Sequence, residues 1–127
     1  MRFINQTKLH SKTVKGNCMT ACFASYLNLS IDDVPVFEEI ENYDYVSDLV
    51  YWLQEKGYDI ETSYEDPFIE DGFKDYYFAC GKSPRSKGIH HLVIYRNDEL
   101  VHDPHPDKTG LLGKPTSYWY LNKIESC

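Results

Sequence analysis

The sequence predicts a single α+β domain in which helices come first and strands follow. The chain has 127 residues, a length typical of one domain with one hydrophobic core. Apolar residues recur at helical spacing in the first half, whereas short aromatic and β-branched runs occupy the second half. This order is typical of α+β proteins. We therefore expect N-terminal helices packed on a C-terminal antiparallel sheet, within one domain spanning residues 1–127.

Two helices are predicted near the N-terminus. The first covers residues 18–29, and Asn17, directly before it, belongs to the residue types that cap helix N-termini. The second is shorter and covers residues 31–37, with Ser30 as its cap. Pro35 limits its length because proline has no backbone N–H for the helix ladder.

A third helix is predicted over residues 45–56. Its apolar stripe consists of Val46, Leu49, Val50 and Leu53. Residues at this spacing share one face of a helix, which would pack on the sheet. Gly57 follows directly and is a common helix terminator.

From residue 58 onward the pattern indicates strands. The predicted strands cover residues 58–64, 75–80, 91–95, 100–102 and 117–124. Asn97 and Asp98 form a two-residue turn that would join the third and fourth strands as a hairpin. Residues 65–74 are acidic and contain a proline and a glycine, so they are expected to be irregular, and residues 81–88 are expected to form a loop.

The charge of the chain argues against nucleic-acid binding. The net charge is −7, and an acidic surface repels phosphate backbones. No Lys or Arg occurs between Lys15 and Lys56, and acidic residues gather there: Asp32, Asp33, Glu38, Glu39, Glu41, Asp44 and Asp48. This stretch is interpreted either as a solvated acidic face or as a docking face for a basic partner.

The sequence indicates a cytoplasmic protein without a membrane partner. The N-terminal residues lack the apolar core of a secretory signal, and no apolar run approaches the roughly 18 residues of a membrane span. Thiols stay reduced in the cytoplasm. The four cysteines, Cys18, Cys22, Cys80 and Cys127, are therefore interpreted as free thiols, metal ligands or nucleophiles rather than as disulfides.

Cys18 is the first candidate for chemistry. It lies in the first turn of a predicted helix, where unpaired backbone N–H groups and the positive end of the helix dipole meet. This position lowers the pKa of a thiol and favours the nucleophilic thiolate. The alternative is a buried cysteine with a structural role only.

A histidine pair at the start of a predicted strand supplies candidate bases. His90 and His91 are adjacent, so their side chains point to opposite faces of the strand and only one can face Cys18. A histidine held at a sheet edge can reach a helix N-terminus packed on that sheet. The alternative is that both have packing or surface roles.

Asp103 is the candidate third residue of a catalytic triad. Counting outward from the hairpin turn pairs Tyr95 with Leu100 and Val93 with His102, which brings Asp103 back beside the start of the histidine strand. A carboxylate there can accept the Nδ1–H of the imidazole, fix its tautomer and stabilise the imidazolium. The alternative is an Asp-Pro turn that merely ends the strand.

Together these segments resemble a known family. GNCMTACFASYLNLSIDDVPVF and HLVIYRNDELVHDPHP are similar to small papain-like proteins that are close to the C39-type peptidases and are often carried by phages. The resemblance spans about residues 6–107. It implies a papain-like fold with Cys18 as nucleophile, His91 rather than His90 as base, and Asp103 as third residue. It also implies that Gln6, the glutamine upstream of the cysteine, donates to the oxyanion.

The resemblance implies a cysteine hydrolase that needs no cofactor or metal. His91 would take the proton of Cys18, and the sulfur would attack an acyl carbon of a protein or peptide substrate. Resolution of the thioester by water gives a peptidase, isopeptidase or amidase, whereas resolution by an amine gives a transferase. If the gene is carried by a phage, the protein is expected in the host cytoplasm.

Two other readings of the same residues stay open. Cys18 and Cys22 lie on one helix face and the chain has five histidines, a composition from which a Cys₂His₂ zinc site can be built. Alternatively, a papain-like protein without catalysis could use its cleft to sequester a host or partner protein.

Overall fold

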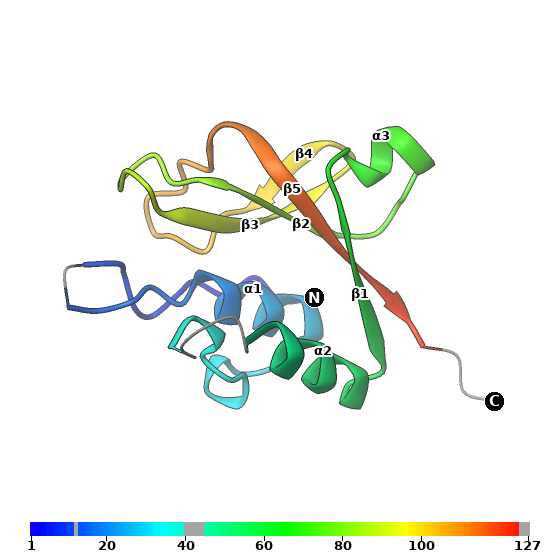
Figure 1. The fold of residues 1–127 in the computed structure, drawn as a ribbon, viewed down its shortest axis with the longest axis horizontal. Helices are drawn as coiled ribbons and strands as arrows, with labels where there is room; N and C mark the ends of the chain where they lie inside the picture. Colours follow the sequence, from blue (N-terminus) through cyan, green and yellow to red (C-terminus); the bar gives the residue numbers. More distant parts are fainter. Residues whose placement is uncertain (12, 40–44, 125–127) are drawn as a thin grey trace.

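The computed structural model describes residues 1–11, 13–39 and 45–124. Its helices are α1 (Cys18–Leu27), η1 (Ile31–Asp33), η2 (Phe37–Glu39), α2 (Tyr45–Glu55) and α3 (Pro67–Asp71). Its strands are β1 (Tyr58–Ser63), β2 (Tyr77–Lys82), β3 (His90–Arg96), β4 (Glu99–His102) and β5 (Leu112–Lys123). The strands form one antiparallel sheet in the order β1-β5-β2-β3-β4, which confirms the predicted mixture of helices and an antiparallel sheet (Figure 1). Cys127 and two members of the acidic stretch, Glu41 and Asp44, lie outside the described residues.

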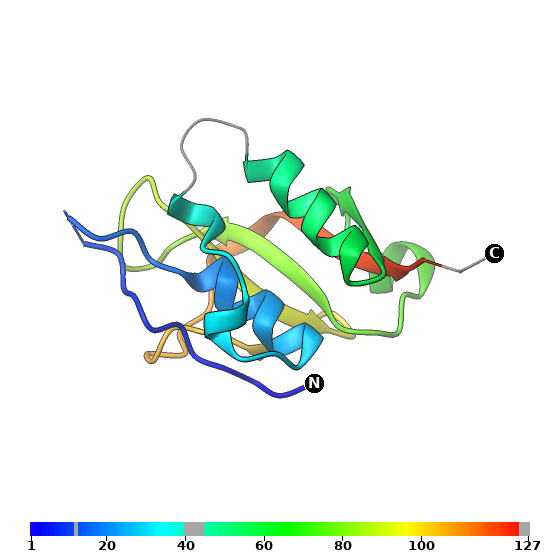
Figure 2. The ribbon, with the colours of Figure 1, turned by 90° about the horizontal axis from the view of Figure 1, so that it is seen from below.

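The helices α1 and α2 cover one face of the sheet (Figures 1 and 2). α1 packs against β3 and α2 packs against β1. The core between them contains aromatic contacts of Phe23 with Phe37 and Phe78. Burying one such side chain stabilises the fold by about 1.5–3 kcal/mol. In α2, Leu49 and Leu53 are buried as predicted, but Val46 is 49% exposed, so the apolar stripe is narrower than expected.

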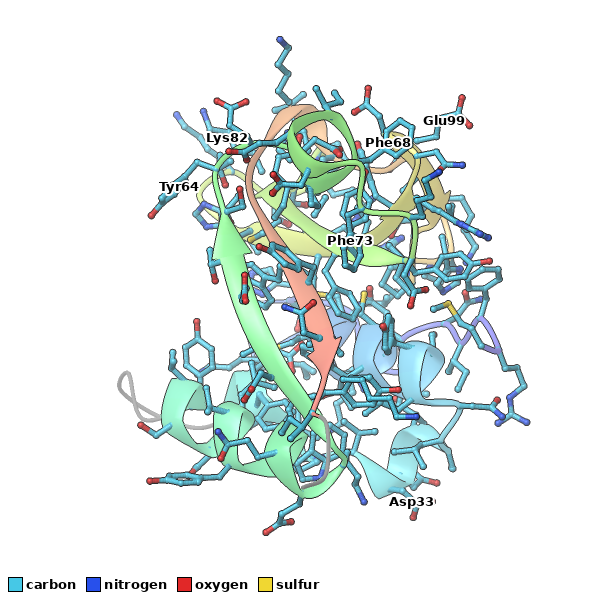
Figure 3. The ribbon with its side chains drawn as sticks, turned by 90° about the vertical axis from the view of Figure 1, so that its right-hand side faces the viewer. Asp33, Tyr64, Phe68, Phe73, Lys82 and Glu99 are labelled. Carbon is cyan, nitrogen blue, oxygen red and sulfur yellow. The ribbon has the colours of Figure 1, made fainter. Side chains whose placement is uncertain are left out.

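A second apolar cluster lies on the opposite face of the sheet. Its buried members are Tyr77, Ala79, Val93 and Tyr118, and Phe68 and Phe73, both labelled in Figure 3, pack against it. Alternation along β2 explains the two clusters, because Tyr77 and Phe78 point to opposite faces.

The helix α3 contradicts the prediction that residues 65–74 are irregular. Asp66 accepts the N–H of Phe68 at 2.8 Å, Pro67 occupies the first helical position, and Gly72 follows the helix with φ of 69°. This combination of cap, proline and terminal glycine is a sufficient start and stop signal. A single turn of helix offers too little periodicity to be found by apolar spacing.

The predicted helix over residues 31–37 is replaced by two short 3₁₀ turns. η1 is capped by Ser30, as predicted, because the side chain accepts the N–H of Asp32. Pro35 then separates η1 from η2. Proline lacks the N–H that would continue the first turn into the second.

The β3–β4 hairpin has the predicted turn but a different register. Asn97 and Asp98 have φ of 56° and 63°, which is the geometry of a two-residue hairpin turn. Tyr95 pairs with Leu100, as predicted, and Arg96 pairs with Glu99. Farther out, His102 pairs with Ile94 and not with Val93, because the register shifts between Ile94 and Tyr95. The shift inserts one extra residue into β4, and Asp103 follows directly.

Candidate active site

Cys18 begins α1, as predicted, and is partly buried. Burial raises the pKa of its thiol to about 12, and the negative charge of Glu38 adds to the rise. Hydrogen bonds with the backbone of Leu92 and of Met19 act to lower this pKa. The prediction that the helix start favours the thiolate is therefore wrong for the resting site. Loss of water around the sulfur outweighs the helix dipole.

The start of α1 lies against the part of β3 that carries His91. A hydrogen bond with the backbone of Leu92, the residue after His91, lowers the pKa of the Cys18 thiol. One turn farther along α1, Cys22 is buried and donates its S–H to the Leu92 carbonyl at 3.4 Å. Two side chains of the helix thus meet one backbone position in the strand.

The side chain of Glu38 caps the N-terminus of α1. Its Oε2 accepts the backbone N–H of Met19 at 2.7 Å, and its Oε1 accepts the hydroxyl of Thr20 at 3.1 Å. A carboxylate is stabilised at this end of a helix, where N–H groups lack partners within the helix. Burial raises the pKa of Glu38, and these hydrogen bonds oppose the rise. The residue comes from η2, far from α1 in sequence.

Asn17 does not cap α1, contrary to the prediction. Its side chain makes no capping hydrogen bond. Glu38 accepts the backbone N–H of Met19 in its place, and the side chain of Asn17 binds the N-terminal segment. Its Oδ1 accepts the N–H groups of Thr7 and Lys8 at 3.0 and 2.9 Å, and its Nδ2 donates to the Thr7 hydroxyl at 2.9 Å. These bonds fasten the segment next to Gln6 onto the start of the helix.

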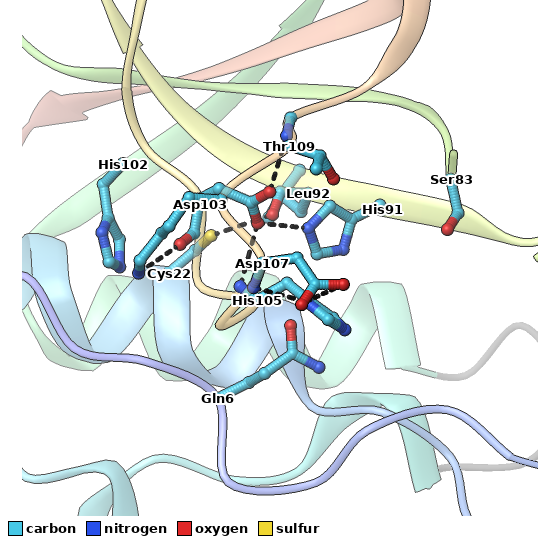
Figure 4. Close-up of polar contacts among 12 residues, drawn as sticks. Gln6, Cys22, Ser83, His91, Leu92, His102, Asp103, His105, Asp107 and Thr109 are labelled. Carbon is cyan, nitrogen blue, oxygen red and sulfur yellow. Dashed lines mark hydrogen bonds and ion pairs between the residues drawn. The ribbon is translucent and has the colours of Figure 1, made fainter. Parts of the chain in front are cut away.

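His91 and Asp103 form a buried pair, shown in Figure 4. Nε2 of His91 lies 2.6 Å from Oδ1 of Asp103, and the two residues are 5% and 2% exposed. The prediction that Asp103 meets the start of the histidine strand is confirmed. The contacting nitrogen, however, is Nε2 and not the predicted Nδ1. Within the part of the chain that the structure describes, Nδ1 makes no hydrogen bond.

Asp103 is held by three donors. Besides His91, the backbone N–H of His105 donates to Oδ1 at 2.9 Å and that of Gly110 donates to Oδ2 at 2.8 Å. Burial acts to raise the pKa of Asp103, but these hydrogen bonds outweigh it and lower the pKa to about 2. The carboxylate is therefore ionised at neutral pH. It is suited to hold the imidazole in one tautomer.

The other histidines of the two strands differ in their surroundings. His90 is exposed, whereas His91 is buried, so alternation separates them as predicted. His102 contacts the carbonyl of Ile4 through Nε2 at 2.8 Å and stacks on Phe3 with ring centroids 5.1 Å apart. His102 thus anchors the N-terminal segment.

A cavity of about 310 Å³ brings the predicted residues together. Its wall includes Cys18 from α1, His91 from β3 and Gln6 from the N-terminal segment. Asp103 lies behind His91 and supports it from the buried side. The three elements are far apart in sequence, and packing of α1 on β3 brings them to one opening.

Gln6 has one free buried oxygen. Its Nε2 donates to the carbonyl of Lys8 at 2.8 Å, while its Oε1 is buried without a hydrogen-bond partner in the described residues. An amide nitrogen carries two hydrogens, so one N–H remains for a ligand. In Figure 4 the side chain extends toward His91 and His105.

Sequence reasoning did not assign several residues of this cavity wall to the site, among them Glu38, Arg85 and His105. The ring centroids of His105 and His91 lie 6.3 Å apart in an edge-on arrangement. The Asp103-Pro104 turn returns the chain to the site two residues later, a short-range signal that could have identified His105. Glu38 and Arg85 carry no such signal, because only tertiary packing brings them there.

No gathering of three His, Cys, Asp or Glu side chains suited to a metal ion occurs in residues 1–11, 13–39 and 45–124. The zinc alternative therefore finds no ligand set in those ranges. None of the described helices combines the length and apolarity needed to cross a membrane. Comparison with protein-family models, curated proteins and solved structures finds no match to this chain.

Proposed function

We propose that the chain is a papain-like cysteine hydrolase that acts on a protein or peptide substrate. One observation carries the proposal: the buried His91–Asp103 pair and Cys18 belong to one site, with Cys18 and His91 in the same cavity wall. A nucleophile, a base and a group that orients the base are the minimum needed for acyl transfer through a covalent intermediate.

The roles follow from the contacts. Asp103 binds Nε2 of His91 and so leaves Nδ1 as the nitrogen that accepts the proton of Cys18. Because burial keeps the thiol protonated at rest, proton transfer accompanies attack on the acyl carbon rather than preceding it. The Cys18 sulfur then forms a bond to the acyl carbon, giving a tetrahedral oxyanion.

Two donors are assigned to that oxyanion. As the first residue of α1, Cys18 has a backbone N–H without a partner inside the helix, and Gln6 offers its second amide N–H. Each such donor is worth about 3–4 kcal/mol of transition-state stabilisation. His91 next protonates the leaving amine, and the thioester is hydrolysed by water that His91 deprotonates. An amine in place of this water would make the protein a transferase.

The proposal is tested with an acyl-enzyme trap. The protein is incubated with a positional library of fluorogenic peptide amides, and the quenched mixture is analysed by mass spectrometry for acylation of Cys18. We expect turnover by the native chain and none by Cys18→Ser or His91→Ala, while Cys80→Ser, which alters another partly buried thiol, keeps its activity. Turnover that survives in Cys18→Ser would refute the assignment.

A second candidate is a catalytically silent papain-like protein that sequesters a partner. The raised pKa of Cys18 favours it, because a thiol with a pKa of about 12 is a poor nucleophile unless a base acts on it. The rate of Cys18 alkylation by iodoacetamide separates the candidates. In a hydrolase this rate falls in His91→Ala, whereas in a silent protein it is slow and does not depend on His91.

A further inference from the structure

The wall of the proposed active-site cavity holds more basic than acidic side chains, unlike the chain as a whole. The chain carries a net charge of −7, with 20 acidic and 13 basic residues. The cavity wall, in contrast, includes Lys15, Arg85 and four histidines, and Glu38 is its one acidic member among the described residues. Basic side chains in a concave site attract anionic ligands.

The acidic member is already engaged. Both oxygens of Glu38 accept hydrogen bonds from the first turn of α1, at Met19 and Thr20. The first turn of the helix therefore occupies both of its oxygens. Within the described residues Glu38 forms no ion pair with Lys15 or Arg85, so it does not occupy their donors.

Arg85 is the basic group best placed to bind a ligand. Its Nη1 donates to the hydroxyl of Thr109 at 2.7 Å, and within the described ranges no carboxylate lies within 4 Å of the guanidinium. Burial lowers the pKa of His105, and the charge of Arg85 lowers it further, so this charge acts on a ring that lies next to that of His91. A guanidinium has five N–H donors, and one neutral contact leaves most of them free.

The loop that carries Arg85 is internally braced. The N–H of Ser83 donates to the carbonyl of Ile89 at 2.9 Å, and the N–H of Arg85 donates to the hydroxyl of Ser83 at 3.2 Å. With its backbone braced and its guanidinium bound to Thr109, Arg85 loses less conformational entropy on binding than an unrestrained side chain. The sequence predicted only a loop over residues 81–88, and the structure places Arg85 of this loop in the cavity wall.

From these observations we propose that the substrate carries a carboxylate close to the scissile bond, bound by Arg85 with Lys15 nearby. The planar guanidinium matches a carboxylate in a two-pronged contact. The partner is thus an acidic peptide, with the carboxylate supplied by an Asp or Glu side chain or by a chain terminus. This inference rests on the proposed function, since it specifies the substrate of the same site.

Two reagents of nearly equal size test the preference without requiring turnover. Iodoacetate and iodoacetamide both alkylate thiols, with iodide as the leaving group, but only iodoacetate carries a carboxylate. The rate ratio of iodoacetate to iodoacetamide is measured at Cys18 by peptide mass spectrometry and compared with the ratio for N-acetylcysteine. We expect the ratio at Cys18 to exceed that of the free thiol by about fivefold or more, as a charge-assisted hydrogen bond implies.

Variants assign the effect to Arg85. Arg85→Gln should lower the ratio toward that of the free thiol, and Arg85→Lys should retain part of it. Lys87→Gln is the matched control, since it removes one positive charge from the same loop and Lys87 is not part of the cavity wall. Added salt should reduce the preference of the native chain, because exposed charges are screened. A preference unchanged in Arg85→Gln would overturn the inference.

The outcomes separate this inference from the proposed function. If Cys18 reacts in a His91-dependent manner but shows the ratio of the free thiol, only the substrate inference fails. If neither reagent labels Cys18, both fail. Peptide amides then locate the carboxylate: a Glu peptide with an amidated C-terminus is compared with its Gln counterpart, and a Gln peptide with a free C-terminus is the third arm. Equal turnover of all three would contradict the inference.

Discussion

Replacing Asp103 by Asn removes one charge from a site where three donors converge. The carboxylate accepts from His91 and from the backbone N–H of His105 at Oδ1, and from the N–H of Gly110 at Oδ2. Asparagine keeps one oxygen but presents an NH₂ group at the other position. That group is itself a donor, so at least one buried donor loses its acceptor.

The magnitude follows from the pKa of Asp103. Lowering this pKa from 3.8 to about 2 corresponds to about 2.5 kcal/mol of stabilisation at neutral pH, because a tenfold change in acidity is worth about 1.4 kcal/mol. We therefore expect Asp103→Asn to reduce the free energy of unfolding by about 2–3 kcal/mol at pH 7. The lowered pKa also determines how this contribution to stability depends on pH. A lowered folded-state pKa stabilises the protein above about pH 4, and this contribution is lost as the pH falls through about 2.

The assay is urea unfolding of both proteins from neutral pH downward. Asp107→Asn is the control, since Asp107 has the same charge, follows in the same turn and has a side chain that is 58% exposed. The gap between native chain and Asp103→Asn should narrow as the pH falls from about 4 to 2, whereas Asp107→Asn should stay near the native value throughout. A gap below about 0.5 kcal/mol at pH 7, or one that does not change with pH, would refute the reasoning.

Three further changes test other parts of the structure. Burial raises the pKa of Cys18 and the charge of Glu38 adds to the rise. Glu38→Gln keeps a hydrogen-bond acceptor for Met19 but removes this charge, so alkylation at pH 8 should accelerate, about tenfold for each unit that the pKa falls. No acceleration beyond that of the exposed control Glu39→Gln would contradict this cause. If the proposed hydrolase assignment holds, Gln6→Ala should lower peptide turnover by about 10²–10³, whereas Gln54→Ala, on the exposed face of α2, should leave it unchanged. Equal rates for the two variants would contradict the proposed role of Gln6 as an oxyanion donor. Tyr77→Phe removes a buried hydroxyl that contacts Asp66 at 2.7 Å on the far face of the sheet; it should cost about 1–3 kcal/mol in urea unfolding and leave Cys18 alkylation unchanged, whereas a changed alkylation rate would show that the two faces are coupled.

The amino-acid sequence determined the features that depend on neighbouring residues. The start of α1 at Cys18, the end of α2 before Gly57 and the turn at Asn97 and Asp98 follow from local periodicity and turn preferences. The Asp66-Pro67 cap shows the limit of this approach, because one turn of helix has no period to detect. Local rules work where the backbone chooses its conformation from its own side chains.

The hairpin allowed the contact between Asp103 and His91 to be predicted, but not which nitrogen of His91 makes it. Adjacent strands must return past one another, so the meeting of Asp103 with His91 could be predicted by counting from the turn. The register shift near Ile94 and the choice of Nε2 over Nδ1 depend on how the strand bends and how the ring packs. Neither has a signature in the sequence.

Only the tertiary structure decided the electrostatics of the site. Glu38 accepts the backbone N–H of Met19 at the start of α1, although the two residues are 19 positions apart in the sequence. Asn17 does not cap the helix, because its side chain binds the backbone of Thr7 and Lys8 instead. The pKa of the Cys18 thiol is raised because packing removes water from the sulfur, which outweighs the opposing backbone hydrogen bonds of Leu92 and Met19. Desolvation and charge act through space and depend on every segment that packs nearby. Residues far apart in the chain therefore set the chemistry of a cysteine whose position the sequence alone had predicted.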